Sequence, residues 1–380
     1  MSPELIGLVG MIILFVLLGL RIPVAFAMFA VGFVGNMILN SPQAAMSQLA
    51  SDSFSLAASA ELVVVPLFIL MGNVATETGM SRKLYDAAYA WIGHLRGGLA
   101  SATVFACGGF AALSGSSVAS ALTIGRVSLA EMDRFNYDNR LSTGVVAAGG
   151  TLGILIPPST GFVIYALLTQ ESIGRLFLAG VLPGLLLLSM FILTIQIMTW
   201  IKPEMGPKGP KTTFTEKMRS TSGAAPILLV IVLTIGGIYT GVFSPGEAAA
   251  VGAGLVILFG ILQRQLNFTN FWKAARESVV TTATVMLILI SAYMIKTFLA
   301  LSHIPQALGT YLETLAIPVL GVLAIMLAIY LVLGCFLEGF AMMVLSMPIF
   351  FPVVQQLGID PIWFGVLVEI GRASCRERVW

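Results

Sequence analysis

The feature that most constrains this chain is a succession of long apolar runs. Ten of them occupy residues 5–20, 24–39, 61–75, 97–112, 144–168, 176–200, 225–242, 247–262, 279–301 and 315–333. An apolar helix of about 20 residues spans the hydrocarbon core of a bilayer. Only 10% of the residues are charged, against roughly 25% in soluble proteins. The runs are continuous and lack the alternation of a membrane barrel, so we predict an all-α polytopic membrane protein surrounded by a lipid bilayer.

Charge and cysteine content exclude several functional classes. The net charge is +2 and no basic cluster with interleaved aromatics occurs, so nucleic acid is not an expected partner. Three cysteines and two histidines are too few and too scattered for a disulfide framework or a zinc site. We expect no resident cofactor.

The distribution of Lys and Arg predicts the topology. The basic segment 201–223 is assigned to the cytoplasm, because basic residues concentrate on that side. Of the 17 Lys and Arg before residue 371, 15 then lie inside, provided that the segments near 114–117 and near Glu338 are hairpins that enter and leave by the same face. The N-terminus is predicted to face out.

The two halves of the chain carry similar sequence features at a constant spacing. An offset of 222 residues relates Pro23 to Pro245, and it carries Gly115 to Leu337, beside Glu338. Inverted repeats with broken helices are typical of secondary transporters. We therefore predict a first repeat at 1–201, a cytoplasmic linker at 202–223 and a second, incomplete repeat at 224–370.

The first candidate site is the small polar run from Ser114 to Ser117. Small polar residues at membrane depth are expected to line a cavity or bind an ion, since backbone groups there have no water. Hydroxyl and carbonyl oxygens suit Na⁺. The alternative is a small-residue patch for helix packing.

The second candidate site is a double proline, Pro157 and Pro158, preceded by Gly149, Gly150 and Gly153. Proline lacks the N–H that would pair with the carbonyl four residues earlier. The carbonyls of Gly153 and Ile154 are therefore released as potential cation ligands. The alternative is an ordinary proline kink.

The third candidate site is Glu338, flanked by Gly334 and Gly339 and followed by Pro348, which is expected to break the helical run. An intramembrane carboxylate marks an ion path, a proton relay or a buried partner. A structural hydrogen bond to a neighbouring helix is an equal alternative. Segments 82–96 and 267–277 are amphipathic and are predicted to be interfacial helices at the cytoplasmic surface.

The motifs resemble those of the large membrane subunit of the tripartite ATP-independent periplasmic (TRAP) transporters. The resemblance rests on VPLFILMGN (65–73), GHLRGGLA (93–100), SGSSVASALTIG (114–125), AAGGTLGILIPPS (147–159), SPGEAAAVGA (244–253) and the stretch 336–365 that begins FLEGFAMM. It implies an elevator-type fold with two re-entrant hairpins. It also implies Na⁺-coupled carboxylate import into the cell, with Na⁺ as the coupling ion, across the inner membrane of a bacterium or archaeon. The resemblance further implies that the protein is not an enzyme.

The resemblance also implies the partners and the site residues. The partners are a small membrane subunit and a periplasmic substrate-binding protein that delivers the carboxylate, for example a dicarboxylate, sialic acid or sugar acid. By matching positions, Ser114 and Ser117 with backbone oxygens of Gly153, Ile156 and Pro158 form a first Na⁺ site, and Gly334 and Gly339 a second. Ser116 and Glu338 are assigned to the substrate.

The end of the chain departs from the family pattern. The 222-residue offset predicts a second unwound double-proline segment near 372–381, yet residues 371–380 read GRASCRERVW. We predict that 371–380 is a non-native tail and that the second repeat is truncated; a genuine basic terminus is the alternative.

Three other functions stay open at this stage. They are a single-component Na⁺ carrier of the same superfamily, an intramembrane serine protease and a purely structural subunit. The protease would need His94 or His303 near the serines.

Overall fold

The computed structural model describes residues 2–307, 310, 318–334, 337 and 339–376, and every regular element in these ranges is a helix. The helices are α1 (Pro3–Gly19), α2 (Val24–Leu39), α3 (Pro42–Ala58), η1 (Ala60–Val63), α4 (Val64–Glu77), α5 (Met80–Ile92), α6 (Gly98–Ser114), α7 (Ser117–Arg134), α8 (Asn139–Leu155), α9 (Thr160–Thr169), α10 (Ile173–Ile201), η2 (Pro203–Met205), α11 (Phe214–Tyr239), α12 (Pro245–Leu262), α13 (Phe268–Leu301), α15 (Val319–Gly334), α16 (Gly339–Gln356) and α17 (Pro361–Arg376).

The helices have the lengths and composition of membrane spans. Within the described ranges, seven are long and apolar enough to cross a bilayer, and four shorter ones are apolar. Within the described residues, each of the ten predicted runs coincides with one helix or, at 61–75 and 144–168, with two. The prediction of an all-α polytopic membrane protein is confirmed. Two helices were not predicted: α3, whose sequence is rich in Ser and Gln, and α17, whose last residues belong to the predicted tail.

The chain forms two compact units. The first unit comprises residues 1–62, 163–172 and 281–380, and the second comprises 63–162 and 173–280. Each unit therefore combines residues from both halves of the sequence. The inverted symmetry predicted for 1–201 and 224–370 is a separate property, and it stays a prediction.

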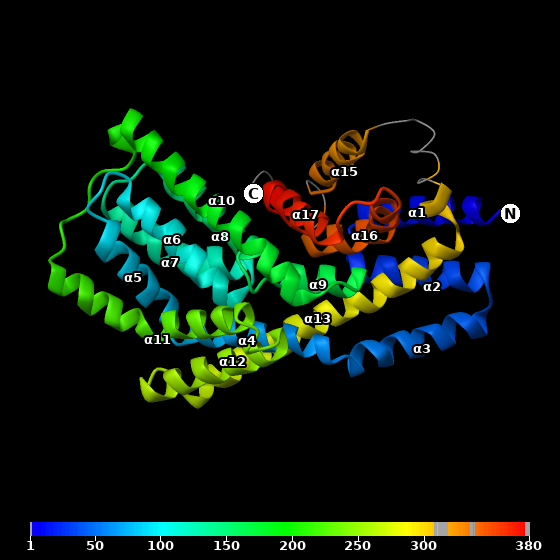
Figure 1. Ribbon diagram of the computed structural model, residues 1–380, viewed down its shortest axis with the longest axis horizontal. Helices are drawn as coiled ribbons and strands as arrows, with labels where there is room; N and C mark the ends of the chain where they lie inside the picture. Colours follow the sequence, from blue (N-terminus) through cyan, green and yellow to red (C-terminus); the bar gives the residue numbers. More distant parts are fainter. Residues whose placement is uncertain (1, 308–309, 311–317, 335–336, 338, 377–380) are drawn as a thin grey trace. The chain divides into compact units, whose positions relative to one another are not determined.

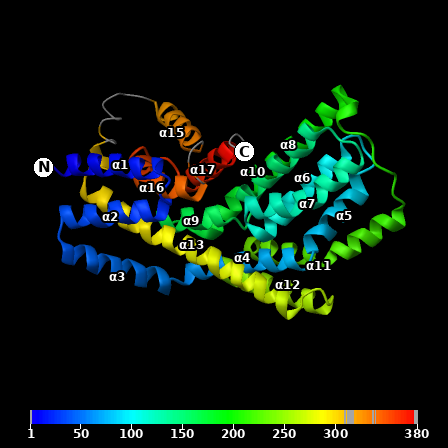
Figure 2. The same cartoon turned by 180° about the vertical axis from the view of Figure 1, so that it is seen from behind.

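In the first unit, glycines on α2 bring it against the second part of α13 (Figures 1 and 2). A Cβ at Gly32 would lie 2.7 Å from the Ile295 nitrogen and 2.8 Å from the Met294 carbonyl carbon. One turn on, Asn36 donates from Nδ2 to the Met294 carbonyl at 3.1 Å. Small residues at helix contacts allow backbones to approach, which is a main source of helix association in membranes.

We expect Gly32→Ala to lower stability. The added methyl group would meet backbone atoms of α13, and overpacking of this kind costs about 1–3 kcal/mol. Thermal unfolding of the detergent-solubilised protein measures the effect. Gly254→Ala in α12 is the matched control, because no atom lies within 4 Å of the position that its methyl group would take; an equal loss in both variants would contradict the explanation.

In the second unit, α6, α7 and α8 lie side by side (Figures 1 and 2). The predicted linker 202–223 is packed against their ends, and it becomes helical again from Phe214. Gly97 N–H donates to the Gly206 carbonyl at 2.9 Å, and Asp138 N–H to the Met205 carbonyl at 3.1 Å. The Tyr137 hydroxyl donates to the Pro207 carbonyl at 2.9 Å. Burial raises the pKa of Tyr137 to about 12, so the phenol keeps its proton.

Two local predictions were wrong. Pro348 does not break the helix, because α16 continues from Gly339 to Gln356 with Pro348 and Pro352 inside it; neighbouring groups in a membrane protein can satisfy the carbonyls that a proline releases. Segment 267–277 is not a separate helix, because it forms the beginning of the 34-residue helix α13. The other amphipathic segment does form its own helix, α5.

Candidate functional site

The first hairpin turns at Gly115. Helix α6 ends at Ser114, α7 begins at Ser117, and the turn between them places Gly115 at φ +56°. Only glycine adopts this left-handed backbone conformation without steric cost. Ser116 is the extended N-cap of α7, and its hydroxyl accepts from Ala119 N–H at 3.4 Å. Four consecutive small residues thus allow a tight turn between α6 and α7.

The second element is a break between α8 and α9. Helix α8 ends at Leu155, α9 begins at Thr160, and residues 156–159 are not helical. Pro157 and Pro158 have no N–H, so the carbonyls of Gly153 and Ile154 lack their intrahelical donors. The predicted unwinding at the double proline is present in the structure.

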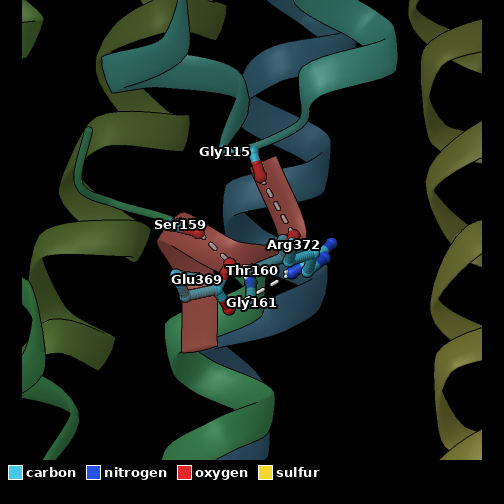
Figure 3. Close-up of polar contacts among 6 residues, drawn as sticks. All are labelled: Gly115, Ser159, Thr160, Gly161, Glu369 and Arg372. Carbon is cyan, nitrogen blue, oxygen red and sulfur yellow. Dashed lines mark hydrogen bonds and ion pairs between the residues drawn. The ribbon is translucent and has the colours of Figure 1, made fainter. Parts of the chain in front are cut away.

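The hairpin tip contacts this unwound segment. A Cβ at Gly153 would lie 2.8 Å from the Ser116 carbonyl group and 2.9 Å from the Ser117 nitrogen. A Cβ at Gly115 would lie 2.5 Å from the Pro158 carbonyl oxygen. Thr160 donates two hydrogen bonds to the Gly115 carbonyl, from N–H at 3.3 Å and from Oγ1 at 3.0 Å (Figure 3). Absence of side chains at Gly115 and Gly153 is what allows the contact.

Oxygen atoms without formal charge dominate this contact. Ser114, Ser117 and Ser159 are 4%, 6% and 1% exposed, and Ser116 is half-buried. The Ser114 hydroxyl lies 3.2 Å from that of Ser120. In the part of the chain that the structure describes, no group of three or more His, Cys, Asp or Glu side chains gathers as a metal site would require. Hydroxyl and carbonyl oxygens suit a hard cation, whereas imidazole and thiolate ligands suit zinc.

The structure therefore brings together most residues of the predicted first Na⁺ site. Ser114, Ser117, Gly153 and Pro158 all belong to the contact between the hairpin and the break. Ile156 begins the break, and its side chain lies near Gly108 of α6 and Gly184 of α10.

Sequence reasoning missed two residues at this site. Gly72 of α4 packs directly against the hairpin tip, since a Cβ at this position would lie 2.7 Å from Ser114 Cα. Thr160 reaches the Gly115 carbonyl from the start of α9. Gly72 is within the VPLFILMGN motif and Thr160 directly follows PPS. Their positions in these motifs were the only sequence signal that could have pointed to them. Only the three-dimensional contacts show what each residue does at the site.

The second hairpin is only partly described. Gly334 ends α15 and Gly339 begins α16, while Glu338 lies outside the described residues. Arg372 packs against Gly339, with its guanidinium carbon 4.2 Å from the centre of the Phe340 ring. Arg372 also forms a buried ion pair with Glu369, Nη1 to Oε2 at 3.1 Å (Figure 3). Arg372 lies in the stretch 371–380, for which the non-native origin stays a prediction.

His94 does not lie beside the serines of the first hairpin. His94 precedes α6 and Ser114 ends it, so a helix of 17 residues, about 25 Å long, separates them. A serine nucleophile needs a base within hydrogen-bond reach. This geometry does not support His94 as the base of a serine protease.

Two solved transporters resemble this chain in fold. The YdaH transporter of Alcanivorax borkumensis matches with a TM-score of 0.60 and 15% identity, over 89% of this chain and 78% of that one. MtrF of Neisseria gonorrhoeae matches with a TM-score of 0.61 and 14% identity, over 90% and 75%. Identity this low shows the fold alone, which is that of an all-α polytopic membrane protein.

Sequence relatives give the family. Residues 11–372 match the family described as the DctM component of the tripartite ATP-independent periplasmic transporter. The C4-dicarboxylate TRAP transporter large permease DctM of Pseudomonas aeruginosa is 38% identical, over 88% of this chain and 78% of that protein. The sialic acid permease SiaM of Vibrio cholerae is 32% identical, over 91% and 80%. The chain belongs to the TRAP large-permease family.

Family membership decides several predictions. The protein is a multi-pass inner-membrane transporter subunit and not an enzyme, which excludes the protease. It is a TRAP large permease, so the single-component carrier and the purely structural subunit are also excluded.

Proposed function

We propose that this subunit imports a carboxylate by Na⁺-coupled secondary transport, and that the hairpin tip seated on the unwound segment is its first Na⁺ site. The supporting observation is that contact: buried hydroxyls of Ser114 and Ser117 beside a segment where Gly153 has lost its intrahelical partner. Carbonyl oxygens that prolines release at membrane depth need another partner. A Na⁺ ion supplies it.

Because this site carries no formal charge, Na⁺ binding is coupled to binding of the carboxylate substrate. Oxygen ligands without charge bind Na⁺ weakly unless they are held in place, and a carboxylate substrate nearby supplies both negative charge and order. Each ligand then raises the affinity of the other by the same factor. Ser116, the half-buried residue at the tip, is our candidate for contact with the substrate, together with Glu338; Gly334 and Gly339 are the candidates for a second Na⁺ site.

The substrate class is proposed from the relatives. DctM of Pseudomonas aeruginosa and of Rhodobacter capsulatus are named for C4-dicarboxylates, and SiaM for sialic acid. We propose a four-carbon dicarboxylate first and a sugar acid second. The proposed partners are a small membrane subunit and a periplasmic binding protein, and the proposed motion is an elevator-type movement of the hairpin-bearing part.

Uptake into proteoliposomes tests the proposal. The full chain is reconstituted with and without a small membrane subunit and a binding protein, and uptake of labelled succinate and sialic acid is measured in Na⁺ and in K⁺. The expected result is uptake that requires Na⁺ and the binding protein. Equal uptake in K⁺ would remove Na⁺ coupling, and uptake without the binding protein would remove the need for delivery.

We expect Ser117→Ala to weaken Na⁺ binding. The change removes one proposed ligand oxygen, and a neutral hydrogen-bonding partner is worth roughly 1 kcal/mol, so the apparent Na⁺ affinity should fall about fivefold. The Na⁺ dependence of thermal stability measures it. Ser189→Ala is the control, because Ser189 is on α10 and its hydroxyl bonds the Leu185 carbonyl of its own helix. An unchanged Na⁺ affinity in Ser117→Ala would remove Ser117 from the site.

A further inference from the structure

Thr160, at the start of α9, bonds the hairpin turn across 45 positions of sequence. Its N–H and its hydroxyl both donate to the Gly115 carbonyl, at 3.3 Å and 3.0 Å. Thr160 is 7% exposed. A buried carbonyl oxygen with two donors has both lone pairs occupied, so the Gly115 carbonyl is held in one orientation and is not available as an ion ligand.

Fixing this carbonyl fixes the next amide as well. The peptide bond is planar and trans, so the Ser116 N–H points opposite to the Gly115 carbonyl. The Ser116 N–H donates to the Ser114 hydroxyl, with 3.5 Å between the Ser116 nitrogen and Ser114 Oγ. The Ser114 hydroxyl in turn lies 3.2 Å from that of Ser120. The orientation of a proposed Na⁺ ligand thus depends on a peptide plane that Thr160 sets.

From this geometry we infer that Thr160 is a positioning residue for the first Na⁺ site, acting through the Gly115–Ser116 peptide and contacting no ion itself. The inference rests on the proposed function. Glycine leaves the backbone of a turn conformationally free. The Thr160 hydroxyl restricts this turn to one orientation. Preorganised ligands bind more tightly, because less ordering is needed when the ligand arrives.

The test uses three variants of the full chain. Thr160→Val keeps the shape and the backbone donor but loses the hydroxyl, and Thr160→Ser keeps the hydroxyl. Thr103→Val is the matched control, since Thr103 is fully buried in α6 and its hydroxyl bonds the Leu99 carbonyl of its own helix. Thermal unfolding of the detergent-solubilised proteins is followed over a series of NaCl concentrations, with KCl at equal ionic strength as the reference.

The expected result is a fall of about fivefold in apparent Na⁺ affinity for Thr160→Val, the value of one neutral hydrogen bond. Thr160→Ser should restore the affinity to within about twofold of wild type, and Thr103→Val should leave it unchanged. A Thr160→Val protein that is less stable in KCl yet binds Na⁺ like wild type overturns the inference, because the hydroxyl then serves stability alone. A wild-type chain with no Na⁺-specific shift overturns the proposed Na⁺ site and this inference with it.

Discussion

Gly153→Ala should weaken Na⁺ binding by this transporter subunit by at least several-fold. The new methyl group would lie 2.8 Å from the Ser116 carbonyl group and 2.9 Å from the Ser117 nitrogen. These are backbone atoms of the hairpin tip and cannot rotate away, so the tip has to move off the unwound segment. Overpacking of this kind costs about 1–3 kcal/mol, which corresponds to a roughly 5- to 150-fold loss in an equilibrium constant.

The measurement is Na⁺-dependent thermal stabilisation, with Na⁺-driven uptake as a second readout. Gly144→Ala is the matched control on the same helix, α8, because nothing lies within 4 Å of its Cβ position. Replacing an exposed helical glycine with alanine should stabilise that control by about 0.5–1 kcal/mol. Wild-type Na⁺ affinity in Gly153→Ala would mean that the contact between tip and break is not part of the ion site.

The double substitution Pro157→Ala, Pro158→Ala should remove the proposed Na⁺ site. Gly153→Ala acts by adding a steric clash, whereas this double substitution acts by restoring helical hydrogen bonds and should not weaken the fold. Each alanine restores an N–H that can donate to the carbonyl of Gly153 or Ile154, and a proline inside a helix costs about 3 kcal/mol. Helix α8 is therefore expected to extend through residues 156–159 and to join α9. The two released carbonyls would then be paired within the helix.

The expected outcome is loss of the Na⁺-specific shift with unchanged or higher stability in KCl. Circular dichroism should show no loss of helix. Pro183→Ala in α10 is the control, since Pro183 also lies inside a helix but takes no part in the contact. A double variant that still responds to Na⁺ would show that the carbonyls of Gly153 and Ile154 are dispensable, and the ion site would have to be sought elsewhere.

Both variants bear on what the sequence could predict. The turn at Gly115 and the break at Pro157 and Pro158 were predicted in position, because glycine and proline act through their own covalent structure. Their contact was expected only through the family resemblance. Hydrophobic runs located the helices for the same local reason, since each residue contributes to hydropathy independently of the fold.

Other features depended on neighbours that are distant in sequence. Pro348 stands inside α16 instead of ending it, and segment 267–277 continues into α13. The linker bonds to Gly97 and Asp138 through its backbone, which no side-chain pattern indicates. Backbone hydrogen bonds in irregular segments leave little signature in the sequence.

By itself, the sequence determined that this chain is helical, spans a membrane many times and breaks its helices at Gly115 and at Pro157, since apolarity, a missing Cβ and a missing N–H are properties of single residues. Only the tertiary structure decided that the tip rests on the break, that Gly72 supports it and that Thr160 holds its carbonyl. Contacts of this kind arise from packing between segments tens of residues apart, and at 2.5–3 Å the presence or absence of one methyl group determines whether they form.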